Sequence, residues 1–133
     1  MTTNTGCTVF NMYNKRFYAS NLDAVLWIAT KGANIIRTGI ETADAVKVII
    51  PRAVKAERAF LPPYEYAAQA SPDGFWTLAP KDKIMKGYYA SGEISNEDMK
   101  RLAETKDNLF TVTSVDFKDF GSESLHYWRV GGR

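Results

Sequence analysis

The chain has 133 residues, of which 45% are hydrophobic and 13% are aromatic. This length suits one domain, and the apolar fraction is high enough for a core, which excludes a disordered chain. The 17 Lys and Arg nearly balance the 15 Asp and Glu and leave a net charge of +2. A dedicated duplex-DNA binder usually has a stronger basic excess. We therefore expect one globular domain over residues 1–133.

Two residue counts limit the chemistry. The chain has one cysteine, Cys7, and one histidine, His126. These counts exclude an internal disulfide, a multi-cysteine zinc site and a metal site with two imidazoles. Met1 to Thr8 lacks the basic and apolar regions of a secretory signal, and no apolar run approaches the roughly 20 residues of a membrane helix. We expect a soluble, non-secreted protein made in a reducing cell, with no membrane association.

The first fifty residues predict strands separated by turns. Period-two alternation and β-branched or aromatic residues mark the strands, and polar residues mark the turns. Pro51 ends the strongest predicted strand because it cannot donate to a strand ladder. The expected strands are Thr8–Tyr13, Leu22–Thr30 and Ala45–Ile50, with a further extended segment at Ile35–Arg37 and turns at Asn14–Arg16 and Lys31–Asn34.

A long loop is expected at about residues 51–74. From Arg52 to Gly74 the sequence has three prolines and no sustained period, although helical turns at Val54–Phe60 and Tyr64–Ala70 are compatible with it. Long connections within compact domains are usually functional. We expect the loop to project from the domain, with candidate contact residues Arg52, Lys55, Arg58, Tyr64 and Tyr66.

The second half predicts four more strands: Phe75–Leu78, Ile84–Ala90 as its continuation or hairpin partner, Leu109–Val115 and Leu125–Val130. Asp116–Ser124 is expected to be a turn-rich connection, and Gly131–Arg133 a short tail. Many short strands with irregular turns favour a mainly β fold, a small antiparallel barrel or sandwich.

One short α-helix is expected over about residues 95–105. Ser95 is a good N-cap, and Asp98 stands at the capping-box position. The apolar face of this helix is predicted to contain Met99, Leu102 and Ala103.

The candidate chemical sites are weak. His126 could act as a base with Asp116, Asp119 or Glu123 and a serine at 122 or 124, but a hydrogen-bonded strand histidine is the preferred interpretation. The same three carboxylates could bind a cation, and a solvated turn explains them equally well. Cys7 is expected to be a small buried hydrophobe. We expect no enzyme, no catalytic residues, no metal and no cofactor.

The aromatic residues allow two interpretations. They could form a base-stacking platform on an OB-like barrel that binds single-stranded nucleic acid, or they could fill a core and a protein interface. The second interpretation is favoured because acidic residues are interspersed among the cations. The aromatic set is Tyr13, Phe17, Trp27, Trp76, Tyr88, Tyr89, Tyr127 and Trp128, and the cations are Lys15, Arg16, Lys31, Arg37 and Lys47.

Two runs carry a family resemblance. Residues 75–87 contain the pattern W-x-L-x-P-x-D-x-I-x-x-G, from Trp76 to Gly87. Later come Val112–Asp116, Gly121-Ser122 and His126–Gly132. These runs resemble small neck proteins of long-tailed bacteriophages, described as minor capsid or head–tail joining (stopper) proteins. The resemblance covers mainly Ala45 to Arg133, together with the strand-like Val9 to Asn14.

The resemblance implies a structural role. A stopper is a small β-barrel that forms a ring, a hexamer or else a dodecamer, beneath the portal and its adaptor and above the tail terminator or tail tube. Its ring passes DNA during ejection, and subunit loops close the channel. The implied location is the virion neck, after assembly in the host bacterial cytoplasm. The loop at 51–74 would then be mobile in the free subunit and gain order in the ring. A tail terminator or tail-completion ring protein is the alternative within the same class.

The C-terminal strand suggests a subunit interface. Tyr127 and Trp128 point to opposite faces of a strand, so both cannot enter one core. One of the two is expected at an interface, and the Gly131-Gly132 pair is expected to let Arg133 extend onto a partner. The candidate interface residues are therefore Tyr127, Trp128 and Arg133.

Overall fold

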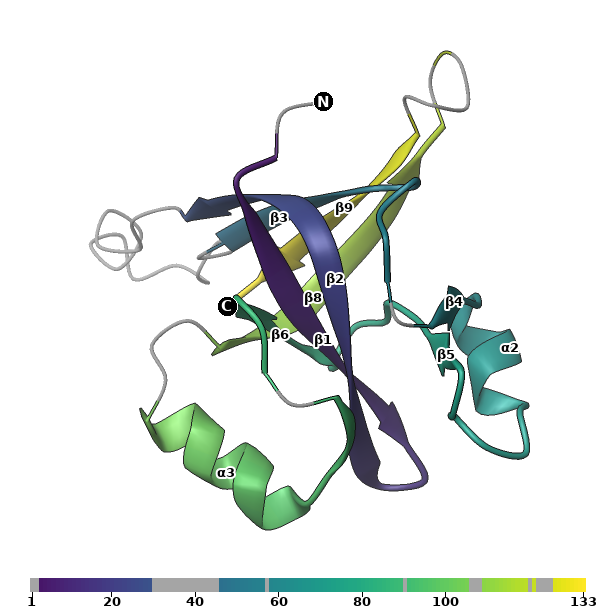
Figure 1. Cartoon of the computed structure of the whole chain (residues 1–133), viewed down its shortest axis with the longest axis vertical. Helices are drawn as coiled ribbons and strands as arrows, with labels where there is room; N and C mark the ends of the chain where they lie inside the picture. Colours follow the sequence, from purple (N-terminus) through teal and green to yellow (C-terminus); the bar gives the residue numbers. More distant parts are fainter. Residues whose placement is uncertain are drawn as a thin grey trace.

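The computed structural model of the chain describes residues 3–29, 46–56, 58–89, 91–105, 109–119, 121 and 126–133 (Figure 1). Strands dominate it, and two short helices accompany them. The elements are β1 (Thr5–Tyr13), β2 (Arg16–Ala29), β3 (Val46–Pro51), β4 (Ala59–Phe60), α2 (Pro63–Ala67), β5 (Phe75–Trp76), β6 (Lys83–Lys86), β7 (Gly92–Ile94), α3 (Asn96–Thr105), β8 (Leu109–Lys118) and β9 (Tyr127–Gly132).

Six of the strands form a closed antiparallel barrel. The order around the barrel is β1, β2, β3, β9, β8 and β6, and β6 pairs again with β1. Strand β7 adds to β2 outside this circuit. The prediction of a mainly β fold with a small antiparallel barrel is confirmed. Closure leaves most strands without an open edge.

Strands β1 and β2 form a long hairpin around a two-residue turn. Asn14 and Lys15 both have positive φ, 53° and 67°. Positive φ at both central residues is the geometry of a type I′ turn, whose twist matches that of the flanking strands. The predicted turn is confirmed. The predicted turn at 31–34 and the extended segment at 35–37 lie outside the described residues.

Two apolar clusters fill the molecule. The larger one lies inside the barrel and includes Val9, Leu22 and Val130, all fully buried. The second lies between the barrel and α3, where Met99 and Leu102 pack near Phe10.

Helix α3 begins as predicted. The Asp98 N–H donates to the Ser95 side-chain oxygen at 3.1 Å, which confirms the N-cap. Met99 and Leu102 are buried, but Ala103 is exposed, so its predicted place on the apolar face is wrong. A helix of about three turns contacts the barrel through a narrow stripe, and Ala103 lies beside that stripe.

The connection between β5 and β6 differs from the expected hairpin. Strand β5 has only two residues and pairs in parallel with β4, whereas β6 pairs with β1 and β8. Lys81 has φ 79°, and this turn separates the two strands. The predicted strand at 84–90 ends at Lys86 because Gly87, with φ 85°, redirects the chain.

The C-terminal hairpin is longer than predicted. Asp116–Lys118 belong to β8 and pair with Tyr127–Arg129, so a turn-rich connection does not begin at Asp116. Gly131 and Gly132 are buried residues of β9 rather than a tail. A Cβ atom at Gly132 would lie 3.1 Å from Val46 and 3.3 Å from the Thr111 carbonyl oxygen, so glycine here permits close packing of the strands.

Arg133 continues the ladder of β9. Its N–H donates to the Thr111 carbonyl at 3.0 Å, and its carbonyl accepts from the Thr111 N–H at 2.9 Å. The expectation that a glycine linker lets Arg133 extend onto a partner is therefore wrong.

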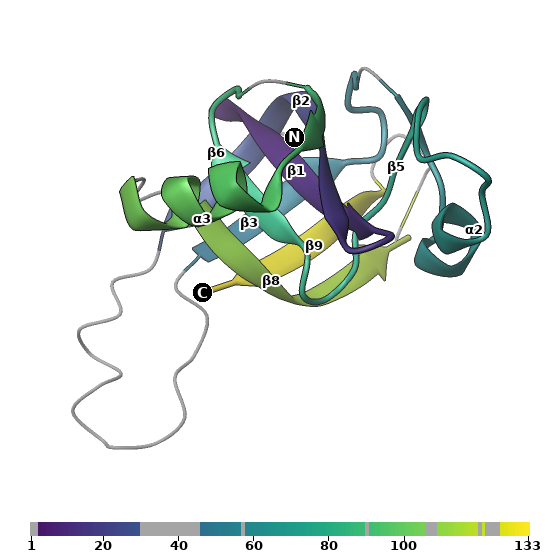
Figure 2. The ribbon, with the colours of Figure 1, turned by 90° about the horizontal axis from the view of Figure 1, so that it is seen from below.

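The segment from Arg52 to Gly74 has structure of its own and stands beside the barrel, on a different side from α3 (Figures 1 and 2). A helical turn at Val54–Phe60 is not formed, because Ala56 bridges to Leu22 and Ala59–Phe60 is a strand. The second predicted helical turn is confirmed as α2. We name residues 52–74 the lateral segment.

The lateral segment is attached to the barrel. The Arg58 Nη1 donates to the Ala19 carbonyl at 2.9 Å and to the Ser20 side-chain oxygen at 3.2 Å. Tyr66 is 2% exposed, and its ring lies edge-on to Tyr13 at 5.9 Å. The expectation that this segment projects away from the domain is wrong, since its apolar side chains pack against the barrel.

Replacing Arg58 by alanine is expected to lower the free energy of unfolding by about 1–3 kcal/mol, because two buried acceptors on β2 lose a charged donor. Lys55→Ala is the matched control. Lys55 is exposed, so its loss should change stability by no more than about 0.5 kcal/mol. Urea unfolding followed by circular dichroism measures both values. Equal, small effects would mean that Arg58 does not hold the lateral segment on the barrel.

Candidate functional site

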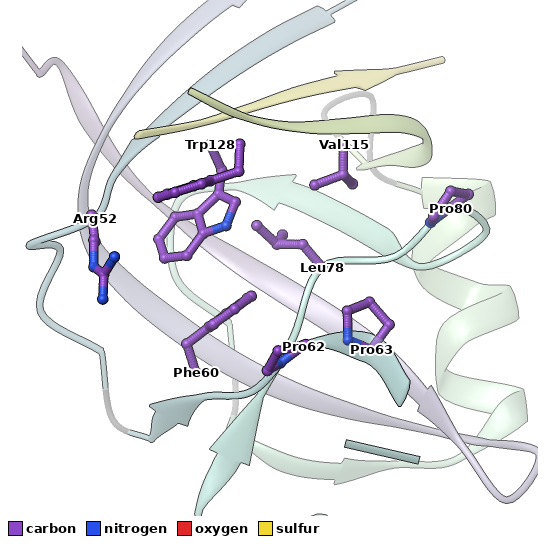
Figure 3. A pocket seen from close by; sticks show the side chains of 9 residues that line it. Arg52, Phe60, Pro62, Pro63, Leu78, Pro80, Val115 and Trp128 are labelled. Carbon is purple, nitrogen blue, oxygen red and sulfur yellow. The ribbon is translucent and has the colours of Figure 1, made fainter. Parts of the chain in front are cut away.

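A groove separates the lateral segment from the end of the barrel formed by β8 and β9 (Figure 3). Its volume is about 680 Å³. In Figure 3, Trp128 and Val115 face Phe60, Leu78 and the rings of Pro62 and Pro63 across the groove. The lining residues are Arg52, Phe60, Pro62, Pro63, Leu78, Pro80, Val115, Phe117 and Trp128.

Aromatic rings form one end of the groove. Trp128 lies at the centre, with ring centroids at 4.5 Å from Phe60, 5.6 Å from Phe117 and 5.7 Å from Trp76. These pairs are tilted or edge-on, the arrangements that aromatic quadrupoles prefer. Trp128 is 8% exposed and Phe117 is 44% exposed, so the cluster runs from the core to the surface.

The exposed ring of Phe117 has two polar neighbours. The Arg52 guanidinium lies 5.9 Å from its centroid, within the range of a cation–π contact. The His126 ring meets Phe117 edge-on at 5.7 Å. Within the described residues, the buried Nδ1 of His126 has no hydrogen-bond partner. The backbone carbonyl of His126 accepts from the Arg52 N–H. The prediction that His126 lies on a strand is wrong, because His126 precedes β9. The predicted hydrogen bond is made by its backbone carbonyl and not by the imidazole Nδ1.

A buried carboxylate, Asp82, follows the groove residue Pro80 in the chain. Asp82 is 4% exposed and accepts from the Asn11 Nδ2 at 2.9 Å and from the Met12 N–H at 3.1 Å. Burial is the main effect on its pKa and raises it to about 6. Asn11 also holds Thr77, donating to its carbonyl at 2.7 Å and accepting from its N–H at 3.1 Å. Together these bonds join β1 to the chain that follows β5.

The run that carries the family resemblance has a structural explanation. Trp76, Leu78 and Ile84 are buried, Asp82 makes the bonds just described, and Gly87 has positive φ. Pro80 lines the groove. These residues thus contribute to the core, the turns and the groove.

The predicted loop residues do not gather at one place. Arg52 lies at the groove, and Lys55 lines a separate hollow of about 430 Å³ with Asp23 and Tyr88. Tyr64 is 75% exposed on α2. Arg58 is bound to β2 and Tyr66 is buried, so neither can line a channel in this conformation.

The predicted interface residues separate as the strand geometry requires. Trp128 faces the core and the groove, whereas Tyr127 lies half-buried on the opposite face of β9. Sequence reasoning missed Phe60, Phe117 and Leu78. The alternation of Val115 and Phe117 in β8 was a usable signal, but the strand was expected to end at Val115.

The base-stacking platform, the less favoured of the two interpretations, is not formed by the aromatic residues that the structure describes. Phe17, Trp27, Trp76 and Trp128 are buried. Arg16 is paired with Glu93 at 2.5 Å. Lys31 and Arg37 lie outside the described residues. Four of the eight aromatic residues therefore belong to the core.

Other reactive groups are dispersed. Cys7 is fully buried, as expected, and burial raises the pKa of its thiol, which stays protonated. In the part of the chain that the structure describes, no three His, Cys, Asp or Glu side chains come close enough to hold a metal ion. The helices of the described residues are also too short or too polar to cross a bilayer.

The fold and the groove define a small closed β-barrel protein with an apolar, aromatic groove at its surface. The chain belongs to a family of unknown function (DUF6751), whose model matches residues 1–133. No curated protein and no solved structure matches the chain.

Proposed function

We propose that the protein is a structural subunit of a bacteriophage neck, a head–tail stopper that assembles into a ring between the portal–adaptor complex and the tail. The observation that carries this proposal is the aromatic groove. Apolar grooves with exposed aromatic rings are typical of surfaces that bind other proteins. The resemblance of residues 45–133 to phage neck proteins, which implies a small β-barrel, supports the same role.

The proposed partners are copies of the chain itself, as a hexamer or a dodecamer, the portal–adaptor complex, and the tail terminator or tail tube. DNA would touch the ring only as it passes. A net charge of +2 suits such a channel, because a strongly basic lumen would retain DNA through counterion release. No catalytic group and no cofactor is needed for this role.

Complementation of particles tests the proposal. A lysate from a phage with this gene interrupted is expected to contain free tails and heads that lose their DNA. Adding the purified full chain should restore tailed, infectious particles, as seen by electron microscopy and plaque counts. Intact tailed particles in the uncomplemented lysate would contradict the proposal.

Binding assays on the same material separate the alternatives. A stopper is expected to bind the portal–adaptor complex, whereas binding only to tail tubes would identify a tail terminator. Tight, salt-sensitive binding to single-stranded DNA, without binding to either, would identify a nucleic-acid-binding barrel instead.

A further inference from the structure

One strand of the barrel is paired on both sides along only part of its length. Leu109–Thr111 of β8 pair with Lys83–Met85 of β6. Val112 extends this pairing by one residue. Its N–H donates to the Asp82 carbonyl and its carbonyl accepts from the Lys81 N–H, both at 2.8 Å. Beyond Val112, strand β9 continues to pair with one side of β8 as far as Lys118. On the other side of β8, no strand of the described chain pairs with these residues. We call Ser114–Lys118 the open edge.

The groove lies against this open edge. Val115 and Phe117 of the edge line it, and Pro62, Pro63 and Pro80 line it as well. Proline has no N–H, so these residues cannot donate to the unpaired carbonyls of β8. Lys81, with φ 79°, marks where the preceding chain turns away from the strand. The edge is therefore faced by apolar rings that cannot complete its ladder.

We propose that the open edge binds an extended segment of a partner protein. The segment adds a strand beside Ser114–Lys118 and places every second side chain, an apolar or aromatic one, in the groove. In this mode of recognition, backbone hydrogen bonds contribute affinity and the pockets for alternate side chains contribute specificity. The groove volume of about 680 Å³ lies in the usual range for ligand sites. This inference stands on the groove and the edge and does not depend on a role in the phage neck.

The shape of the groove further defines the segment. A second copy of the barrel is a poor occupant. Its own open edge is also faced by the proline rings, so two such edges would collide before they could pair. A single extended segment avoids this collision.

Peptide selection on the full chain tests the proposal. From a random dodecapeptide library made by mRNA display, we expect enrichment of peptides with apolar residues at alternate positions. The selected peptide, labelled with fluorescein, is then titrated with the chain by fluorescence anisotropy. Methylating the backbone nitrogens of alternate residues that face β8 should weaken binding at least tenfold, because it removes the ladder donors.

Two matched variants locate the site. Phe117→Asp should weaken binding at least tenfold, whereas Ile28→Asp should leave it unchanged. Phe117 is 44% exposed on β8 and Ile28 is 39% exposed on β2, so the two changes are alike except for the groove. If Phe117→Asp fails to fold, the N-methylated peptides decide the question on the wild-type chain.

Three outcomes would overturn the proposal. They are no enriched peptide, binding that N-methylation does not weaken, and equal effects of the two variants. A dimer of the chain that Phe117→Asp dissociates would show that a second copy occupies the edge, which also overturns it. None of these results decides whether the chain assembles in a phage neck, which the complementation experiment tests separately.

Discussion

Replacing Trp128 by alanine is expected to lower the free energy of unfolding by about 3–5 kcal/mol, the usual cost of removing a large aromatic side chain from a core. The indole is 8% exposed and contacts Phe60, Trp76 and Phe117, so its removal leaves a cavity at the junction of barrel and lateral segment. Urea unfolding at equilibrium, followed by circular dichroism, measures the loss.

Tyr127→Ala is the matched control for this prediction. Its ring lies half-buried on the opposite face of β9, so we expect a loss of about 1 kcal/mol or less. If Tyr127 contacts a neighbouring subunit, the variant should remain folded and dock poorly on the portal–adaptor complex. Equal losses of stability for both variants, or intact docking for both, would end the assignment of Tyr127 to an interface.

The second large effect is a dependence of stability on pH that arises at Asp82. The pKa of its carboxyl is 3.8 ordinarily and about 6 in the folded chain. Between these values the folded state binds more protons than the unfolded state, so the free energy of unfolding falls as pH rises. A pKa difference of roughly two units corresponds to about 3 kcal/mol of stabilisation at low pH. This stabilisation is lost as the pH rises through the folded-state pKa of about 6.

Asp82→Asn isolates this contribution because asparagine does not titrate. The difference in unfolding free energy between the wild type and the variant should change between about pH 4 and 6 and be constant at higher pH. The amide is not a neutral replacement. One of the two carboxylate oxygens accepts from Asn11 and the other from Met12, so the new NH₂ group faces a donor. Parallel curves for the two proteins from pH 4 to 7 would show that Asp82 does not titrate in this window.

Local signals predicted much of the framework. The Asn14-Lys15 turn, the Ser95 cap and the strand near residues 46–50 depend on neighbouring residues, and the structure confirms all three. Long-range packing overrode local signals elsewhere. Gly131 and Gly132 were expected to belong to a short tail, yet both lie in β9. The missing side chain of Gly132 permits the close approach of β3 and β8.

The groove was only partly predictable. Arg52 and Trp128 were candidate residues, and both line it. Phe60, Leu78 and Phe117 were not, since they come from three segments that meet only in three dimensions. The lateral segment illustrates the same limit. Its prolines and missing period indicated a projecting loop, but Tyr66 and Arg58 attach it to the barrel through contacts with distant strands.

By itself, the sequence determined the class of fold: period-two alternation, turn residues and one capped helix require a small antiparallel β protein. Tertiary structure alone decided the closure of the barrel, the position of the lateral segment and the open edge of β8. The physical reason is that turns and caps depend on bonds between residues a few positions apart. Strand partners and grooves depend on which apolar surfaces, distant in the sequence, are buried against one another, and no local pattern specifies that choice.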